Sequence, residues 1–224
     1  DRKISGRRKL AMPGLVNAHT HCAMTLMRNA ADDLSLHRWL FDKIFPIEAR
    51  LTDDDVYWGT VLGFVEMIRS GTTAFADMYL HMEAAAKAAA DSKMRVNTSM
   101  SPLELDPEKG LFVIDRVDEF LKFYNRWNGF GNGRIRVYME VHSTYLFDKK
   151  SLKLSSELAK ELGTGIHIHI SETEKEVKDS FKQYGKSPVE VCEETGIFEV
   201  PVIGAHLVHV SDDDIEILKE YGIN

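Results

Sequence analysis

The sequence predicts an α/β fold: a TIM-like (β/α)8 barrel that is incomplete within these 224 residues. Three observations support this fold class. Short β-type runs alternate with longer helical runs, which is typical of a parallel sheet with helical crossovers. Histidines and acids follow the carboxyl ends of several of these runs, where β/α barrels place their active sites. No Gly-x-Gly-x-x-Gly motif follows the first strand and no Walker A loop occurs, which disfavours an open nucleotide-binding sheet.

The expected strands are short apolar runs between turn residues, and the expected helices show apolar residues at helical spacing. Gly71, Gly163 and Gly196 stand where helices stop, and Asp53 and Ser211 stand where helices begin. The strands are expected at residues 15–19, 72–78, 95–100, 135–142, 165–171 and 202–209, and the helices at 53–70, 82–93, 114–127, 151–162 and 187–195, with another opening at 212.

The count of repeating units is about six, whereas a complete barrel has eight. We therefore expect one partial barrel domain over residues 1–224, without its seventh and eighth strands. This predicts a piece of a longer chain, with unpaired strand edges at both ends of the sheet.

Composition and charge disfavour several classes of function and location. Apolar residues make up 44% of the chain and the net charge is −7, which gives enough core for one large domain and disfavours nucleic acid as a partner. No apolar run reaches the roughly 20 residues of a membrane span, and the polar start does not resemble a signal peptide. Cys22 and Cys192 lack metal or disulfide spacing, so we expect a cytoplasmic protein. A homo-oligomer remains open.

The first candidate metal motif is His19-Thr20-His21, directly after an apolar strand and a Pro-Gly turn. Residues i and i+2 of a strand share a face, so both imidazoles can point at one ion. Zinc, iron and nickel all accept imidazole nitrogen. The alternative is a pair of surface histidines on a loop.

The second cluster is His167-Ile168-His169 followed by Glu172. His169 lies nearer the carboxyl end of its strand and is the predicted ligand, while His167 is deeper and is interpreted as a core histidine. Glu172 falls just beyond the strand, where a carboxylate could shuttle protons between an attacking water and a leaving group.

Two more histidines end predicted strands. His206 directly follows an apolar run and is predicted to assist proton transfer, whereas His209 is expected in the next loop. His142 either contacts substrate or caps its strand. Together these residues predict one crown of metal-binding and proton-transfer groups.

With these motifs in view, the sequence resembles the amidohydrolase superfamily, and within it the S-adenosylhomocysteine/5′-methylthioadenosine deaminases among the chlorohydrolase-like aminohydrolases. The matching stretches run in family order across nearly the whole chain: 12–21, 33–40, 45–48, 70–79, 142–143, 169–172 and 205–206.

The resemblance implies a distorted metal-dependent hydrolase barrel beside a small β-sandwich, the latter absent here. It implies one divalent metal, zinc with iron or nickel as alternatives, and hydrolytic deamination at C6 of an adenine nucleoside with release of ammonia. The fourth strand has no lysine to bridge a second metal. The implied roles are metal ligands for His19, His21 and His169, proton shuttle for Glu172, polarisation of the attacking water for His206, and substrate contacts for Trp39, Glu48 and His142.

Two departures from the family pattern matter. The family's last metal ligand is an aspartate after the eighth strand, which we expect beyond residue 224. The well-matched relatives bind the homocysteine carboxylate with arginines; Arg116 could serve, or could be a surface helix charge, and the third strand ends in Met100 rather than a second arginine.

Several alternatives stay open at this point. Trp39 could pack between helices and Glu48 could be a solvated acid. The substrate could be guanine or a triazine instead of adenosine, 5′-methylthioadenosine or S-adenosylhomocysteine. The chain could also be a non-catalytic metal-binding fragment, or a binding module that does not hydrolyse its ligand.

Overall fold

The centre of the molecule is a parallel sheet of six strands in the order β1-β2-β3-β6-β7-β8. The computed structural model describes residue 3 and residues 5–223. All five pairings within this sheet are parallel, which confirms the predicted β/α organisation. The strands are β1 (Leu15–Thr20), β2 (Thr72–Met78), β3 (Arg95–Met100), β6 (Ile135–Ser143), β7 (Ile166–Ile170) and β8 (Val202–His206).

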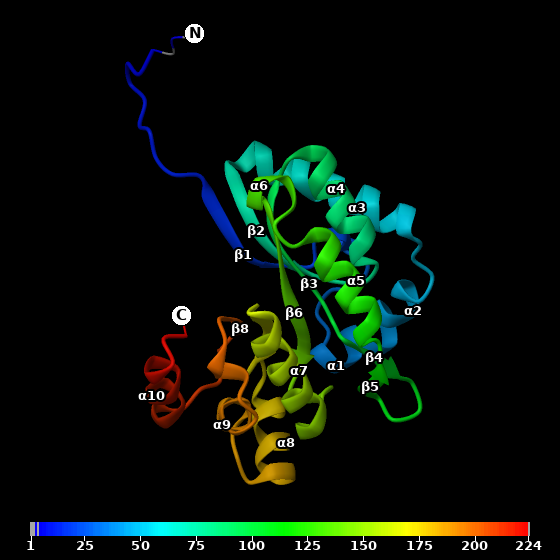
Figure 1. Ribbon diagram of the computed structural model, residues 1–224. Coiled ribbons are helices and arrows are strands. Elements are labelled where there is room, and N and C mark those ends of the chain that lie inside the picture. The colour runs from blue at the N-terminus through cyan, green and yellow to red at the C-terminus, as the bar shows by residue number, and fades with distance from the viewer. Residues whose placement is uncertain (1–2, 4, 224) are drawn as a thin grey trace.

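The sheet is curved and not closed. Among the described residues β1 pairs only with β2, and β8 only with β7. Both ends of the sheet lie on the same side of the molecule, at the left of Figure 1. This is the unfinished barrel that the strand count predicted.

The longer helices connect successive strands and surround the sheet (Figure 1). In chain order, the helices and short helical turns are η1 (Cys22–Met27), α1 (Leu36–Trp39), the π-helical η2 (Leu40–Ile44), α2 (Phe45–Glu48), α3 (Asp53–Ser70), α4 (Met82–Ser92), α5 (Val117–Trp127), α6 (Phe130–Gly133), α7 (Lys149–Leu162), α8 (Glu174–Tyr184), α9 (Pro188–Glu194), η3 (Ile197–Glu199) and α10 (Asp212–Glu220).

Local sequence explains the ends of these helices. Thr52, not Asp53, is the N-cap of α3, because its side chain accepts from the Asp55 N–H in a reciprocal capping box. The expected N-terminal position was therefore one residue late. Ser211 caps α10 as predicted, and Gly71 ends α3 in the left-handed conformation, φ 87°.

One predicted helix begins in the wrong place. The segment expected to be helical from residue 114 starts as strand β5 (Leu111–Asp115), which pairs antiparallel with β4 (Leu103–Asp106). The helix α5 starts only at Val117, and Arg116 is its N-cap residue instead of lying inside it. This hairpin and α8 were not predicted.

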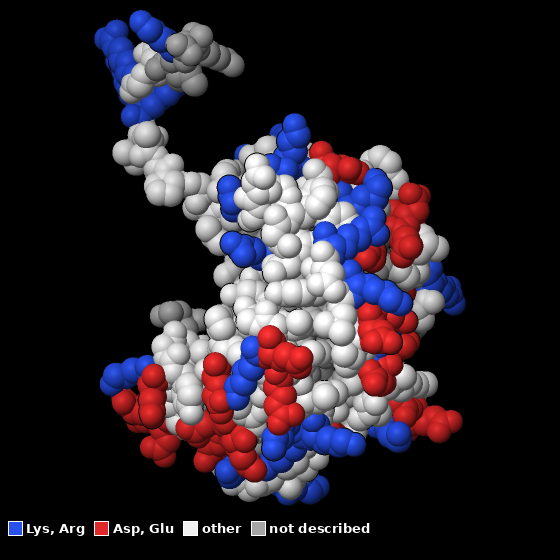
Figure 2. Space-filling view, viewed as in Figure 1, with Lys and Arg blue, Asp and Glu red and all other residues white. Residues whose placement is uncertain are grey.

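The core fills the space between sheet and helices with apolar side chains such as Phe64, Phe120 and Ile168, all at most 1% exposed. Acidic and basic side chains are interspersed on the face shown in Figure 2, around a band without charged residues. Within the described residues, no helix is both long enough and apolar enough to cross a membrane.

Candidate metal centre and its cavity

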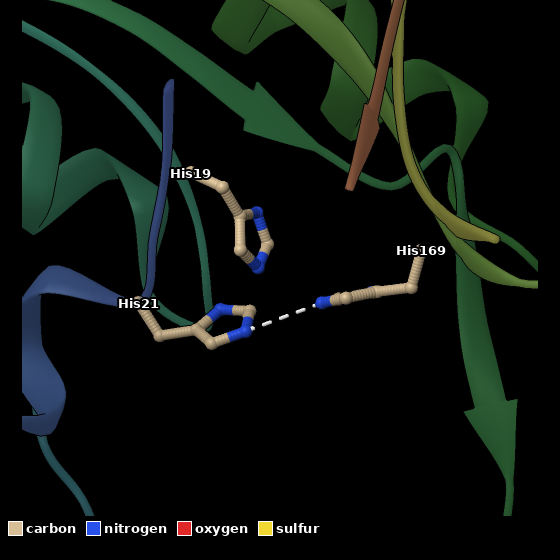
Figure 3. A group of neighbouring side chains, drawn as sticks. All are labelled: His19, His21 and His169. Carbon is tan, nitrogen blue, oxygen red and sulfur yellow. Dashed lines mark hydrogen bonds between the residues drawn. The ribbon is translucent and has the colours of Figure 1, made fainter. Parts of the chain in front are cut away.

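Three imidazoles converge at the carboxyl ends of β1 and β7 (Figure 3). His19 lies in β1, His21 directly follows it, and His169 comes from β7. One ligand atom from each lies within 4.8 Å of the others. The Nε2 atoms of His21 and His169 are 3.3 Å apart, the separation of about 3.3–3.4 Å between two nitrogens that are each roughly 2.0–2.1 Å from a tetrahedral zinc ion. These donors fit a divalent metal ion.

Two of these rings are oriented by backbone carbonyls. His21 Nδ1 lies 2.6 Å from the Met78 carbonyl oxygen, and His169 Nδ1 lies 2.7 Å from that of His142. A carbonyl oxygen only accepts, so each Nδ1 carries the hydrogen and each Nε2 keeps a free lone pair. Both rings are thus held in the tautomer that a metal ion needs.

Burial keeps these imidazoles neutral. It lowers the pKa of His19 to about 4, with further lowering from neighbouring His21 and His206. It also lowers the pKa of His21, and it takes the pKa of His169 well below the usual value. Neutral imidazole is the form that binds metal, so the cluster needs no deprotonation at pH 7.

A carboxylate and a fourth histidine stand beside the cluster. His206 Nε2 is 3.7 Å from a Glu172 carboxylate oxygen, and the His206 ring stacks on His169 with centroids 5.2 Å apart. Burial raises the pKa of Glu172 and lowers that of His206. The pKa of Glu172 is thus moved toward neutrality, which suits proton transfer, while the His206 imidazole is favoured in its neutral form.

The loop that carries Glu172 is held by Glu176, which sequence analysis missed. The buried Glu176 carboxylate accepts hydrogen bonds from the backbone N–H groups of Ser171 and Glu172, at 3.1 and 2.8 Å. Ser171 has a positive φ of 52°, a costly conformation for a residue with a side chain. Glu176 follows Glu172 by four residues, and that spacing was the only local signal for it.

Asp77 fixes the other side of the site and was also missed as a functional residue. Its carboxylate accepts from the Thr20 hydroxyl and from the Cys22 N–H, both at 2.8 Å. These bonds hold the backbone on either side of His21. Burial raises the pKa of Asp77 to about 6, against the lowering effect of these hydrogen bonds.

A cavity of about 1010 Å³ opens beside His21. The four residues expected to contact substrate, Trp39, Glu48, Arg116 and His142, all line it. They come from three parts of the chain, residues 39–48, residue 116 and residue 142, which the fold brings to one cavity.

The environments of these four residues differ. Burial lowers the pKa of His142 to about 3 and raises that of Glu48. Arg116 is engaged by two acids: it donates to Glu119 and lies 3.6 Å from Glu104. Its guanidinium is thus already paired at the rim.

Glu140 is a further cavity residue that sequence analysis passed over. It lies on β6 two residues before His142 and therefore on the same face. Burial, together with the charges of Asp77 and Glu48, raises its pKa to about 8. It is a candidate neutral hydrogen-bond donor in the cavity at pH 7.

His209 and His167, the two other histidines of the motifs, lie where the sequence analysis expected them. His209 is exposed in the loop after β8. His167 is fully buried in β7, with hydrogen-bond partners for both ring nitrogens, which fits the interpretation as a core histidine.

A parallel β/α sheet with an imidazole cluster at its strand ends places this molecule in the class of β/α-barrel proteins with a candidate metal site. The sequence profile described as "Amidohydrolase family" matches residues 10–224, so the chain belongs to the amidohydrolase family. The resemblance stated from the motifs is confirmed at this level.

The chain is similar to curated proteins named 5-methylthioadenosine/S-adenosylhomocysteine deaminase. The one from Acetivibrio thermocellus is 56% identical over 224 residues, which cover 100% of this chain and 51% of the relative. The one from Caldanaerobacter subterraneus is 48% identical over 221 residues, covering 99% of this chain and 51% of the relative. The chain thus spans about half the length of the curated relatives it matches.

Solved structures share the fold. An adenosine deaminase from Xanthomonas campestris with bound zinc aligns with a TM-score of 0.84 at 30% identity, over 94% of this chain and 48% of that one. A zinc complex of the atrazine chlorohydrolase from Arthrobacter aurescens aligns at 0.83 with 20% identity, over 94% and 52%. The second likeness, at this identity, concerns the fold alone.

Proposed function

We propose that this chain is the metal-binding part of a hydrolytic deaminase of adenine nucleosides. The observation that carries the proposal is the set of three imidazoles whose ligand atoms lie within 4.8 Å of one another, with Glu172 and His206 beside them and a cavity large enough for a nucleoside. The names of the relatives support adenosine, 5′-methylthioadenosine or S-adenosylhomocysteine as substrate.

His19, His21 and His169 would hold one divalent ion, with zinc favoured by the zinc-bound relatives. Such an ion acts as a Lewis acid that lowers the pKa of a water nucleophile toward neutrality.

Glu172 would take a proton from the attacking water and deliver it to the departing amino group. His206 would orient that water, since its ring lies against His169 and within 3.7 Å of Glu172. His142, Trp39 and Glu48 would hold the nucleoside in the cavity, with His142 on the purine and Glu48 on the ribose hydroxyls. Arg116 could bind a substrate carboxylate only after breaking its ion pair with Glu119 or Glu104.

We also propose a cytoplasmic location, supported by the two buried free cysteines Cys22 and Cys192. The proposed chemical partner is a small nucleoside.

The test is ammonia release by the zinc-loaded full-length protein from adenosine, 5′-methylthioadenosine and S-adenosylhomocysteine. Guanine, also followed by ammonia release, and atrazine, followed by chloride release, are the rival substrates. We expect turnover with an adenine nucleoside, and loss of about 10²–10⁴-fold in kcat on Glu172→Gln with unchanged zinc content. The matched control is Glu174→Gln, an exposed acid paired with Lys178, which should keep full activity.

If the protein turns over only guanine or only atrazine, that compound is the substrate and the adenine-nucleoside assignment is wrong. Equal activity of wild type and Glu172→Gln would remove Glu172 from the mechanism. If the zinc-loaded protein binds the nucleoside tightly but does not turn it over, the protein is a binding module and not an enzyme.

A further inference from the structure

His167 has no role in the function proposed above, yet it touches the metal site. It is fully buried in β7, two residues before His169. Its Nε2 lies 2.9 Å from Nδ1 of His19, and its Nδ1 lies 3.3 Å from the Ser99 hydroxyl oxygen. The Ser99 hydroxyl in turn lies 2.8 Å from the carbonyl oxygen of Asp77.

The direction of these hydrogen bonds follows from the last acceptor. A carbonyl cannot donate, so the Ser99 hydroxyl gives its hydrogen to the Asp77 carbonyl and must accept from His167. His167 therefore carries its hydrogen on Nδ1, and its Nε2 accepts. The donor to that Nε2 is Nδ1–H of His19.

We propose that Ser99 and His167 form a hydrogen-bond relay that fixes His19 in the tautomer with a free Nε2 directed at the metal site. His167 is then a positioning residue and not a ligand, because both of its nitrogens are engaged. The inference rests on His19 as a ligand and is independent of the substrate.

The relay supplies for His19 what the backbone supplies for its two neighbours. Nδ1 of His21 and Nδ1 of His169 each donate to a main-chain carbonyl, which no side-chain substitution removes. For His19 the acceptor is a side chain. Groups that orient a metal-binding histidine in this way typically change metal affinity by 10–100-fold when mutated.

The main experiment compares His167→Phe with His167→Gln. Phenylalanine fills the space but accepts no hydrogen bond, so the zinc dissociation constant, measured by chelator competition, should rise about 10–100-fold. The Co²⁺ absorption spectrum should change as well. Glutamine can accept from His19 and donate to Ser99, so it should recover most of the affinity and the wild-type spectrum.

A second readout needs no metal. ¹⁵N NMR of histidine-labelled, metal-free protein should show His19 protonated at Nδ1 in the wild type, and a mixture of tautomers in His167→Phe. Ser99→Ala should shift the tautomer balance of His167, whereas Thr98→Val should not. Thr98 is the matched control because its hydroxyl is buried in the same strand without a hydrogen-bond partner among the described residues.

A folded His167→Phe protein with unchanged zinc affinity and an unchanged His19 tautomer would overturn the relay. If His167→Phe does not fold, the Ser99→Ala variant still tests the relay: an unchanged His167 tautomer in that variant would overturn it. None of these readouts uses a substrate, so a failed relay and a failed deaminase assignment give different results.

Discussion

Glu140 is a carboxyl group in the interior of the sheet, and its environment gives the protein a pH-dependent stability. Its folded pKa of about 8 lies above the ordinary value of 4.5 because burial penalises the charged form. Between these two pH values the unfolded chain releases a proton that the folded protein keeps. The contribution of Glu140 to the free energy of unfolding therefore falls as pH rises from about 4.5 to 8, and then levels off.

The change Glu140→Gln should remove that contribution, since glutamine does not titrate. We expect its stability relative to wild type to increase between pH 5 and pH 8, with a slope of at most about 1.4 kcal/mol per pH unit. Urea unfolding at several pH values measures this. The control is Glu157→Gln, an exposed acid on α7; parallel pH curves for wild type and Glu140→Gln would contradict the prediction.

At the residue scale, the sequence was most informative where a histidine or acid ends a strand. His19, His21, His169, Glu172 and His206 were proposed for one site, and the structure brings them together. Their positions follow from the alternation of strand residues and from the shared carboxyl edge of a parallel sheet.

The supporting residues could not be predicted in the same way. Asp77, Glu176 and the Ser99–His167 pair act through hydrogen bonds, and for Asp77 and Ser99 the partners are distant in the sequence, such as the 57 residues between Thr20 and Asp77. No local pattern encodes such a partner.

At the scale of elements, α3 is tied to the metal site by a close approach to η1. A Cβ on Gly59 would lie 2.6 Å from the Ala23 carbonyl oxygen, which is backbone and cannot rotate away. The segment η1 begins directly after His21. Any shift of η1 therefore reaches a candidate metal ligand.

Gly59→Ala should lower the free energy of unfolding by about 1–3 kcal/mol, the usual cost of overpacking. It should also weaken zinc binding, because η1 has to move. Chemical denaturation and chelator competition measure the two effects. The same assays on Val65→Ala, at an exposed position of α3, should change stability by at most about 0.5 kcal/mol; equal behaviour of both variants would argue against a rigid contact.

Elements with strong periodicity and clear caps were predicted almost to the residue, as β2, β3 and α3 show. The hairpin β4–β5 was not, because its two short strands are stabilised by pairing with each other and carry no long periodic pattern. The apolar residues at 112–114 are compatible with the start of a helix as well as with a strand. They form a strand because β5 pairs with β4.

At the scale of the whole molecule, the open sheet is the dominant feature. The outer edges of β1 and β8 lack a neighbouring strand among the described residues, and Leu15 and Val16 on β1 are 51% and 70% exposed. Unpaired edges with apolar side chains pair readily with other chains.

We therefore expect a polypeptide of only these 224 residues to self-associate as its concentration rises, as measured by light scattering and size-exclusion chromatography. A longer chain of its relatives' length should not associate through these edges. Lysine substitutions at Leu15 and Val16 should reduce association of the short polypeptide; a monomer at all concentrations would contradict the prediction.

The order of strands in the sheet also equals their order in the chain. During synthesis, each new strand of the sheet can therefore add to the one made just before it, so assembly can follow translation. The candidate metal centre cannot form strand by strand in this way, because 148 residues separate His21 from His169. At typical rates of about 5–20 residues per second, the ribosome needs roughly 7–30 s between these two ligands. The nascent chain thus carries a two-histidine site for that interval, and tight metal capture has to wait for the arrival of β7.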